Sequence, residues 1–263
     1  MNDNRDTAGG TRPDRALLDK LLTVYGRKPV RETLLDPDIS CHALHLAQSN
    51  RDAAIIAEIR ALAQRRGLPV KLHSRESLAR ISRNGRQDQG VALDVLCPAF
   101  GKLDAYLDTS AGTAKRRLLA LDGITNPQNL GMLIRSAAAG DMDGIVLARS
   151  GNASLGPLVI KASAGTVFHA PMLMCDTLIA GLENCRSQGA EVCILSADAR
   201  QSLFERSAAA FTVYVLGNET EGVSSAVRAL ADRALSIPMR NGVESLNVAV
   251  TASLIAYATH LER

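Results

Sequence analysis

The chain contains few aromatic residues: its 263 residues include four Phe, four Tyr and no Trp. A protein that holds single-stranded bases by stacking needs more aromatic side chains than this. The sequence also lacks an apolar run of the roughly 18 to 20 residues that a membrane helix requires. Because residues 1–12 are polar and resemble no signal peptide, we expect a cytoplasmic protein whose residues 1–20 form a flexible tail.

Cysteine is present but shows no pattern of pairing or metal binding. The five cysteines are odd in number and form no CxxC pair, which argues against a disulfide framework and favours a reducing compartment. The string Cys41-His42-x-x-His45 resembles part of a metal site, yet the sequence offers no second cluster of ligands. A structural zinc ion needs four ligands, so we expect no metal.

The net charge of +3 is unevenly distributed along the chain. Residues 1–117 hold 20 Lys and Arg against 14 Asp and Glu, whereas residues 118–263 hold 10 against 13. A basic first half suggests contact with a polyanion such as nucleic acid, and a solvated charged surface is the alternative. With so few aromatic residues, phosphate contacts and shape would dominate any RNA binding.

Apolar segments of strand length alternate with amphipathic helical segments in two blocks. Residues 21–97 predict a small α/β domain, with strands such as 41–47 and a helix over 52–66. Residues 98–117 contain proline and glycine and predict a linker. Residues 118–263 alternate regularly, which predicts a parallel sheet covered by helices on both faces.

The second block is expected to bind its ligand at one edge of the sheet, because ligands of parallel sheets bind in the loops that follow the strands. Its predicted strands are 118–122, 144–148, 190–197, 212–216 and 234–238. Its predicted helices are about 130–139, 155–163, 176–188, 223–231 and 247–261. Three of the loops after these strands have compositions that deserve a functional interpretation.

The first loop contains Asn126, Pro127 and Asn129 and opens a helix that carries Arg135. A simple turn, with Asn129 as helix cap and a solvent-facing arginine, would explain the same residues. The second loop is the segment 217–222, Gly-Asn-Glu-Thr-Glu-Gly. Its glycines permit close approach of a ligand to the backbone, and its carboxylates disfavour phosphate. The alternative is an acidic helix N-terminus.

The third loop follows the last strand and opens the last helix. It contains Ile237 and Met239 and ends in Ser245-Leu246-Asn247. Ser245 and Asn247 are both plausible helix caps, whereas Met239 and Leu246 could offer apolar contact to a flat ring. Since all three loops follow strands of one predicted sheet, they can converge on one site.

In this order and spacing, the loops resemble the three motifs of the SpoU/TrmH family of RNA ribose 2′-O-methyltransferases. The motifs read N-P-x-N-L-G-x-x-x-R, G-N-E-x-x-G and I-P-M-x-x-x-x-x-S-L-N-V, and the resemblance covers residues 118–263. The first block, from the segment VYGRKPV at 24–30 onward, looks more distantly like the RNA-binding domain of members that modify ribosomal RNA. The resemblance implies an α/β knot (trefoil) domain, a homodimer, and S-adenosylmethionine bound in the knot. A knot is an exception to normal connectivity and could not be found from the strand pattern.

The resemblance also implies roles for individual residues. The implied catalytic residues are Arg135, Asn129, Glu219, Ser245 and Asn247. The implied cofactor-binding residues are Gly217, Asn218, Glu219, Ile237, Met239 and Leu246. The candidates for RNA contact in the basic first block are Arg27, Lys28, Arg31, Arg65 and Arg66. One departure is Gly140-Asp141, which stands where family members often have a bulky residue followed by glycine.

The expected reaction is transfer of a methyl group from S-adenosylmethionine to a ribose 2′-hydroxyl of RNA, with 23S ribosomal RNA favoured because of the extra first domain. Transfer RNA is the alternative substrate. A non-catalytic RNA-binding or ribosome assembly factor is the alternative from another class, and the intact Arg135, Glu219 and Asn247 argue against it. A nicotinamide enzyme is disfavoured because no Rossmann glycine fingerprint is present.

Overall fold

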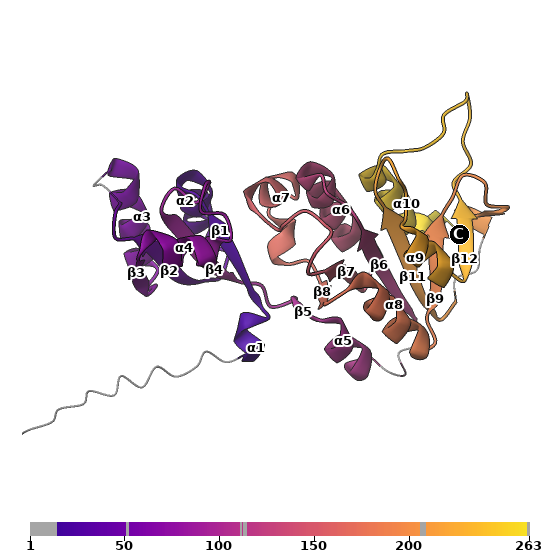
Figure 1. The fold of residues 1–263 in the computed structure, drawn as a ribbon, viewed down its shortest axis with the longest axis horizontal. Helices are drawn as coiled ribbons and strands as arrows, with labels where there is room; N and C mark the ends of the chain where they lie inside the picture. Colours follow the sequence, from indigo (N-terminus) through magenta and orange to yellow (C-terminus); the bar gives the residue numbers. More distant parts are fainter. Residues whose placement is uncertain (1–14, 51–52, 111, 113–114, 206–208, 262–263) are drawn as a thin grey trace, which may run out of the picture.

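The computed structural model of the chain describes residues 15–50, 53–110, 112, 115–205 and 209–261. Two α/β domains follow one another along the long axis of the molecule (Figure 1). The expected tail falls largely outside the described residues, and its described end contains the short helix α1 (Arg15–Leu18). Within the described ranges, none of the helices is both long and apolar enough to cross a bilayer.

The N-terminal domain is built on a four-stranded mixed sheet with the order β1-β4-β2-β3. Strand β4 runs antiparallel to β1 and β2, whereas β2 and β3 are parallel. The strands are β1 (Leu21–Tyr25), β2 (Cys41–Ala47), β3 (Val70–His73) and β4 (Val91–Leu96). The helices are α2 (Arg27–Leu35), α3 (Ala54–Arg65) and α4 (Arg75–Ser82).

The C-terminal domain is built on an eight-stranded sheet with the order β10-β12-β9-β11-β6-β7-β8-β5, in which all paired strands are parallel. The strands are β5 (Gly101–Lys102), β6 (Arg116–Asp122), β7 (Gly144–Ala148), β8 (Met172–Cys175), β9 (Glu191–Leu195), β10 (Gln201–Ser202), β11 (Phe211–Gly217) and β12 (Arg233–Ser236). The helices are α5 (Leu103–Thr109), α6 (Pro127–Ala139), α7 (Pro157–Ala162), α8 (Leu178–Ser187), α9 (Ser225–Leu230) and α10 (Val248–Leu261), with 3-10 turns at Thr166–Phe168 and Leu203–Glu205.

Helices cover both faces of this sheet, which explains why its strands are apolar throughout rather than alternating. In the central strand β6, Leu119 and Leu121 join the core cluster formed with α6, α7 and α10. Leu118 and Ala120 join the cluster on the opposite face, formed with α5, α8 and α9. The expected α/β class and parallel sheet are confirmed, whereas the knot stays a prediction.

The segment expected to be a linker has more structure than its composition suggests. Residues 98–117 contain β5, which pairs with β8, and α5, whose Leu103 and Leu107 are fully buried. Strand β6 also begins inside this segment, two residues before its predicted start. The prediction of a linker over residues 98–117 is therefore wrong, because this segment contains elements of the C-terminal domain.

The basic run at the start of β6 is buried rather than solvated. The Arg116 guanidinium lies over the ring of Phe211, 3.9 Å from the ring centroid. The Arg117 guanidinium donates to the carbonyl oxygen of Ile255 at 2.7 Å and to that of Asp141 at 3.1 Å. Arg117 therefore joins the central strand to the C-terminal helix α10.

Gly140, the departure from the family pattern, has a packing role. Helix α6 ends at Ala139, and a Cβ atom placed on Gly140 would lie 2.7 Å from the Cβ of Ala256 in α10. Such a distance is shorter than carbon atoms tolerate, so glycine allows the end of α6 to touch α10.

Candidate active site

The first two candidate loops begin side by side, because β6 and β11 are neighbours and Gly217 stands opposite Asp122 in their register. Asn218 then ties the loops together. Its side-chain amide donates to the carbonyl oxygen of Gly123 at 3.0 Å, and its carbonyl oxygen accepts from the backbone of Thr220 at 2.9 Å. This side chain therefore shapes the site by holding backbone rather than by facing outward.

The turn after β11 is tight, and glycine is required at its start. Asn218 and Gly222 exchange two backbone hydrogen bonds of 2.9 Å. A Cβ atom on Gly217 would lie 2.1 Å from the carbonyl carbon of Gly222, which is far inside contact distance. Only glycine lets the two backbone segments approach this closely.

Three candidate catalytic residues from three different loops meet in one hydrogen-bonded chain. The side-chain amide of Asn129 donates to a carboxylate oxygen of Glu219, and its carbonyl oxygen accepts from the amide of Asn247 at 3.1 Å. Asn129 is buried, with 9% of its surface exposed. The first, second and third loops thus converge as the sequence predicted for these three residues.

The cap of α6 differs from the expected one. Asn126, rather than Asn129, caps the helix: its side-chain oxygen accepts from the backbone of Gln128 at 2.8 Å and of Asn129 at 3.4 Å. This capping leaves the Asn129 side chain free to face Glu219. Asn247 combines both roles, since its side-chain oxygen also accepts from the backbone of Ala249 at 2.9 Å and caps α10.

A cavity of about 400 Å³ lies between the loops after β6 and β11. Asp122 and Glu221 contribute carboxylates to its lining, and Asp122 also accepts from the backbone of Ser224 at 2.6 Å. Within the part of the chain that the structure describes, its lining includes no lysine or arginine. The cavity therefore suits a cationic or neutral ligand better than an anionic one.

The other candidates lie outside the hydrogen-bonded chain. Arg135 is exposed on α6, nearly two helical turns after Asn129. Ser245 is exposed, and it lies on the long segment between β12 and α10 that rises beyond the carboxyl end of the sheet (Figure 1). The cofactor candidates Ile237, Met239 and Leu246, on the same segment, are half-buried. No hydrogen bond among the described residues joins Arg135 or Ser245 to the cluster.

Comparison with known proteins decides the family. Residues 116–257, more than half of the chain, match the SpoU rRNA Methylase family. The chain belongs to this family of RNA methyltransferases. In this SpoU protein, residues 23–96 also match a second domain, described as RNA 2′-O ribose methyltransferase substrate binding.

Relatives and solved structures agree with this assignment. An uncharacterized tRNA/rRNA methyltransferase from Mycolicibacterium gilvum is 34% identical over 233 residues, which are 88% of this chain and 74% of that protein. The structure of a putative TrmH-family RNA methyltransferase from Porphyromonas gingivalis is 27% identical, with a TM-score of 0.59, and the match covers 93% of this chain and 92% of that one. AviRb from Streptomyces viridochromogenes, solved with AdoMet, shares the fold at 22% identity and a TM-score of 0.59, over 94% of this chain and 92% of its own.

One residue that shapes the site of this SpoU protein was missed in the sequence. The Asn152 side chain accepts from the backbone of Ile124 at 2.7 Å and donates to the carbonyl oxygen of Leu121 at 3.2 Å. It thereby fixes the loop after β6 from the neighbouring loop after β7. The pair Gly151-Asn152, in the turn after the predicted strand 144–148, was the available signal, since asparagine is common in turns that bind backbone.

The arginines predicted to contact RNA are not equally available. The Arg66 guanidinium donates to the carbonyl oxygens of Leu34, at 3.2 Å, and Asp36, at 2.9 Å, so it caps the end of α2. Arg31 pairs with Glu58 at 2.8 Å, and Arg27 donates to a backbone carbonyl at 3.3 Å. Arg66 therefore supports its own domain through these hydrogen bonds, and a contact of Arg66 with RNA stays a prediction. Of the five candidates, Lys28 and Arg65 are the fully exposed ones.

His45, the last residue of the string Cys41-His42-x-x-His45, belongs to a hydrogen-bonded network in the N-terminal sheet. His45 contacts His73 and Asp94, each at 2.9 Å, and Thr23 donates to Asp94 at 2.7 Å. Burial acts to raise the pKa of Asp94, but the hydrogen bonds from His45 and Thr23 outweigh it and lower that pKa. Burial raises the pKa of Cys41. Among the described residues, no three side chains of His, Cys, Asp or Glu are gathered as metal ligands.

Proposed function

We propose that this protein transfers a methyl group from S-adenosylmethionine to a ribose 2′-hydroxyl of ribosomal RNA. The observation that carries the proposal is the chain Glu219–Asn129–Asn247, which places one polar residue from each family motif at a single point. This chain lies next to a carboxylate-lined cavity. That position supports a binding site for the methyl donor beside a binding site for the ribose that accepts the methyl group.

The cavity between the loops after β6 and β11 fits this cofactor. When bound, S-adenosylmethionine supplies a methyl group already activated by a positively charged sulfonium. The carboxylates of Asp122 and Glu221 suit that charge, and Gly123 and Gly222 line the same cavity without side chains of their own. Of the cofactor candidates, Asn218 is in the described lining of this cavity. The candidates outside that lining would complete the site around the bound cofactor: Gly217, Glu219, Ile237, Met239 and Leu246.

The task of the protein residues is mainly to align the 2′-oxygen with the methyl carbon and sulfur. In the reaction an oxygen–carbon bond forms, the carbon–sulfur bond breaks, and the hydroxyl proton leaves. Asn129 is hydrogen-bonded to Glu219 on one side and to Asn247 on the other. Together with Glu219, Ser245 and Asn247 it would fix the position of the ribose relative to the methyl donor. A guanidinium remains charged in proteins and is a poor base, so Arg135 would hold a phosphate and stabilise the developing alkoxide, while a phosphate or water takes the proton.

Replacement of Arg135 by lysine tests this role. A clamp that binds phosphate through two parallel hydrogen bonds loses its geometry in Arg135→Lys, and we expect kcat/KM to fall about tenfold or more. Single-turnover methyl transfer with saturating cofactor measures the loss. Near-normal activity of the lysine variant would contradict the clamp and favour a general base.

A homodimer would bring a second copy near Arg135. Met132, Val250 and Tyr257 are large apolar side chains exposed on the neighbouring helices α6 and α10, and Arg135 is one turn from Met132. Burial of such a surface against a second copy supports a dimer. Light scattering coupled to size exclusion would report the mass of two chains.

The reaction and its substrate are tested together by tritiated methyl transfer from S-adenosylmethionine to total unmodified RNA, followed by size fractionation. We expect label in large ribosomal RNA, at an alkali-resistant linkage. Label in the transfer RNA fraction would keep the reaction and overturn the preferred substrate. Absence of label, with cofactor binding intact by calorimetry, would favour the non-catalytic RNA-binding alternative.

A further inference from the structure

The two domains enclose a second cavity of about 520 Å³ that the proposed reaction does not use. One wall comes from the N-terminal domain, around Tyr25 and residues 80–84. The other comes from the loop after β7, residues 147–156, with Phe100–Lys102 between them. The walls meet closely: a Cβ atom on Gly156 would lie 2.9 Å from the hydroxyl oxygen of Tyr25.

The charge of this cavity is mainly positive. Its lining includes four basic residues and, within the described chain, one acidic residue, Asp19. Asp19 pairs with Lys102 at 2.9 Å, and Arg149 pairs at 2.6 Å with Asp176, whose side chain is 87% exposed. The two remaining basic residues are Arg80 and Arg83, which are exposed and form no ion pair with any described residue.

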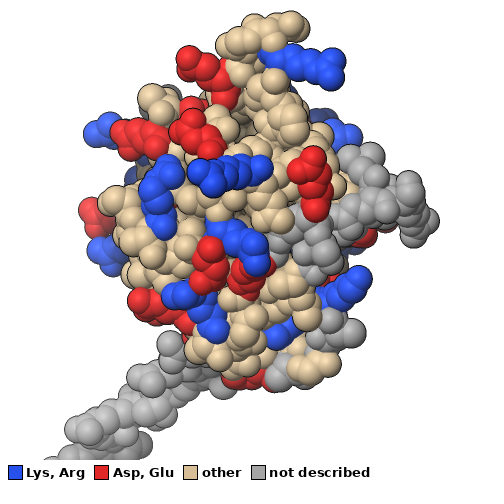
Figure 2. Space-filling view, turned by 90° about the vertical axis from the view of Figure 1, so that its right-hand side faces the viewer, with Lys and Arg blue, Asp and Glu red and all other residues tan. Residues whose placement is uncertain are grey.

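By contrast, lysine, arginine and carboxylate side chains are mixed on the side of the C-terminal domain turned away from the N-terminal domain (Figure 2). A polyanion gains little attraction from a surface on which opposite charges alternate, but is attracted to a recess whose lining has an excess of positive charge. Charge therefore favours the space between the domains as the site of RNA contact.

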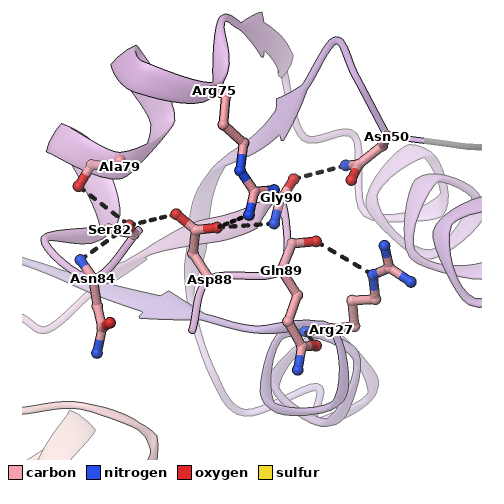
Figure 3. A network of polar contacts seen from close by, with 9 residues as sticks. All are labelled: Arg27, Asn50, Arg75, Ala79, Ser82, Asn84, Asp88, Gln89 and Gly90. Carbon is pink, nitrogen blue, oxygen red and sulfur yellow. Dashed lines mark hydrogen bonds and ion pairs between the residues drawn. The ribbon is translucent and has the colours of Figure 1, made fainter. Parts of the chain in front are cut away.

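The loop that carries Arg83 is held in place by a buried carboxylate. Asp88 is fully buried and accepts from the Ser82 hydroxyl and from the backbone of Gly90, each at 2.9 Å (Figure 3). Arg75 lies 3.9 Å from the same carboxylate. Between these anchors Arg83 adopts a left-handed backbone, with φ of 55°. Arg83 is the C-terminal cap of α4, so this backbone is a usual way to end a helix, and it fixes the point from which the Arg83 side chain extends.

The same loop also connects to the cavity through Tyr25. The Asn84 side-chain amide donates to the Tyr25 hydroxyl oxygen at 3.1 Å. The phenol proton is then available to a ligand in the cavity, and the ring itself offers a surface on which one base can stack. The wall thus combines cations, a hydroxyl donor and an aromatic ring, which together match a nucleotide rather than an isolated anion.

The cavity adjoins the candidate active site. Asn152 lines the cavity and at the same time holds the backbone of Leu121, at the end of β6, and of Ile124, in the loop after β6. That loop is held from its other side by Asn218 through Gly123. The two cavities therefore lie on opposite sides of one short loop, and we expect neighbouring nucleotides of a single strand to occupy them.

We propose that this interdomain cavity binds the phosphates and a base of an unpaired RNA segment next to the methylated nucleotide, with Arg80, Arg83, Lys102 and Arg149 as phosphate contacts. The proposal rests on RNA being the substrate. It assigns RNA binding to the space between the domains, whereas the sequence alone pointed to other basic residues of the first block, namely Arg27, Lys28, Arg31, Arg65 and Arg66. A cavity of about 520 Å³ is too small to hold a duplex, which favours an unpaired strand.

Alanine variants of Arg83 and Arg149, one from each wall, test this proposal. The probe is unmodified large ribosomal RNA transcribed in vitro, and its dissociation constant is measured at several salt concentrations. We expect each variant to bind about tenfold more weakly, as for loss of one charge-assisted hydrogen bond. The plot of log affinity against log salt should become shallower by about 0.7 for each lost contact. Arg83→Lys should restore most of the affinity.

Arg60→Ala is the matched control, because Arg60 is exposed on α3, away from the cavity. It should bind RNA like the unaltered protein. Cross-linking with 4-thiouridine-containing RNA should label peptides from residues 80–86 and 149–156. Unchanged affinity and salt slope in Arg83→Ala and Arg149→Ala, or an equal loss in Arg60→Ala, would overturn the cavity proposal.

The outcomes separate this proposal from the proposed reaction. Methyl transfer by the unaltered protein, combined with unchanged RNA affinity of both variants, would refute the cavity site and leave the reaction intact. Absence of methyl transfer to any RNA, combined with weaker binding of both variants, would refute the reaction and leave the cavity site intact. Thermal melting of each variant checks that the exposed replacements leave the fold unchanged.

Discussion

At the scale of single residues, the orientation of Asn129 follows from the chemistry of its neighbours. An ionised Glu219 can only accept hydrogen bonds, so Asn129 must present its NH₂ group there. Its carbonyl oxygen is then directed to the amide of Asn247. An amide is the side chain of this size that satisfies both partners, because a carboxylate lacks the donor and a hydrocarbon lacks both.

We therefore expect Asn129→Asp to reduce kcat about a hundredfold. The new carboxylate and that of Glu219 would repel each other, and the side chains that orient the reacting groups would move apart. Cofactor affinity, measured by calorimetry, should change little. Ser253→Ala is the control. The Ser253 hydroxyl donates to the Ser136 hydroxyl at 2.8 Å, so this variant removes a different polar contact between α10 and α6. Equal activity of the Asn129 and Ser253 variants would show that the cluster has no role in the reaction.

The sequence predicted which polar residues gather but not how each one is used. Asn129, Glu219 and Asn247 were identified through their motifs, because loops after parallel strands share one edge of a sheet. Asn126 and Asn152 took roles that composition could not assign, since an asparagine in a turn can bind either its own backbone or a neighbouring loop. Partners of Asn152 lie about 30 residues away in the sequence.

At the scale of helices and strands, most segments were predictable from apolar periodicity, and the errors have identifiable causes. Strand β2 and helix α6 matched closely because their apolar runs are long. Helix α5 was missed although Leu103, Tyr106 and Leu107 have helical spacing, because the flanking Pro98 and Gly101 indicated a loop. The order of strands was beyond prediction, since pairing of β6 with β11 joins segments about 90 residues apart.

Arg117 shows how an element is stabilised by a charged side chain from a segment that the sequence predicted to be a linker. Arg117→Ala removes the hydrogen bonds to the Ile255 and Asp141 carbonyl oxygens and leaves a cavity between β6 and α10. We expect the free energy of unfolding to fall by about 3 kcal/mol. Urea unfolding followed by circular dichroism measures this, and Arg149→Ala on the surface should change it by less than about 0.5 kcal/mol. A loss below 1 kcal/mol in Arg117→Ala would contradict the anchoring role.

The histidine network makes the N-terminal sheet sensitive to acid. Burial, with help from His45 and Lys71, lowers the pKa of His73. The folded state therefore takes up this proton less readily than the unfolded chain. The stability that the neutral ring provides is complete above the unfolded pKa of about 6.5, and it is lost as the pH falls through the lower folded value.

We expect the free energy of unfolding to decrease between pH 7.5 and pH 5, and to decrease less in His73→Gln. Urea titrations at the two pH values measure the difference. His169→Gln, at an exposed position, should retain the full pH dependence. The same pH dependence in both variants would exclude His73 as its source.

At the scale of the whole molecule, the boundary between the domains lies earlier than the sequence indicated. Strand β5 and helix α5 complete the edge of the large sheet, so the C-terminal domain begins near residue 99. The excess of basic residues in the first half therefore does not form one surface. Two of these residues are buried in the core of the C-terminal domain, namely Arg116 and Arg117. Two others, Arg80 and Arg83, line the interdomain cavity.

Two truncations separate these boundaries. Residues 99–263 retain β5 and α5, and we expect this fragment to bind S-adenosylmethionine within about threefold of the whole chain but to bind RNA at least about tenfold more weakly. Residues 106–263 lack the buried Leu103, and their melting temperature should be several degrees lower. Equal melting temperatures would contradict the placement of α5 in the domain, and equal RNA affinity of 99–263 and the whole chain would contradict a role of the N-terminal domain.

The meeting of Asn129 and Asn247 has a consequence for how the protein matures. Asn129 is translated well before Asn247, which opens the last helix, and β6 pairs with a strand that follows it by some 90 residues. Contacts between such distant segments form slowly and late in folding. An unfinished chain on the ribosome therefore contains the RNA-binding domain and the first loop, yet lacks the partner that orients the reacting groups. Competence for the reaction would appear only after synthesis reaches α10, so an abortive product could occupy RNA without modifying it.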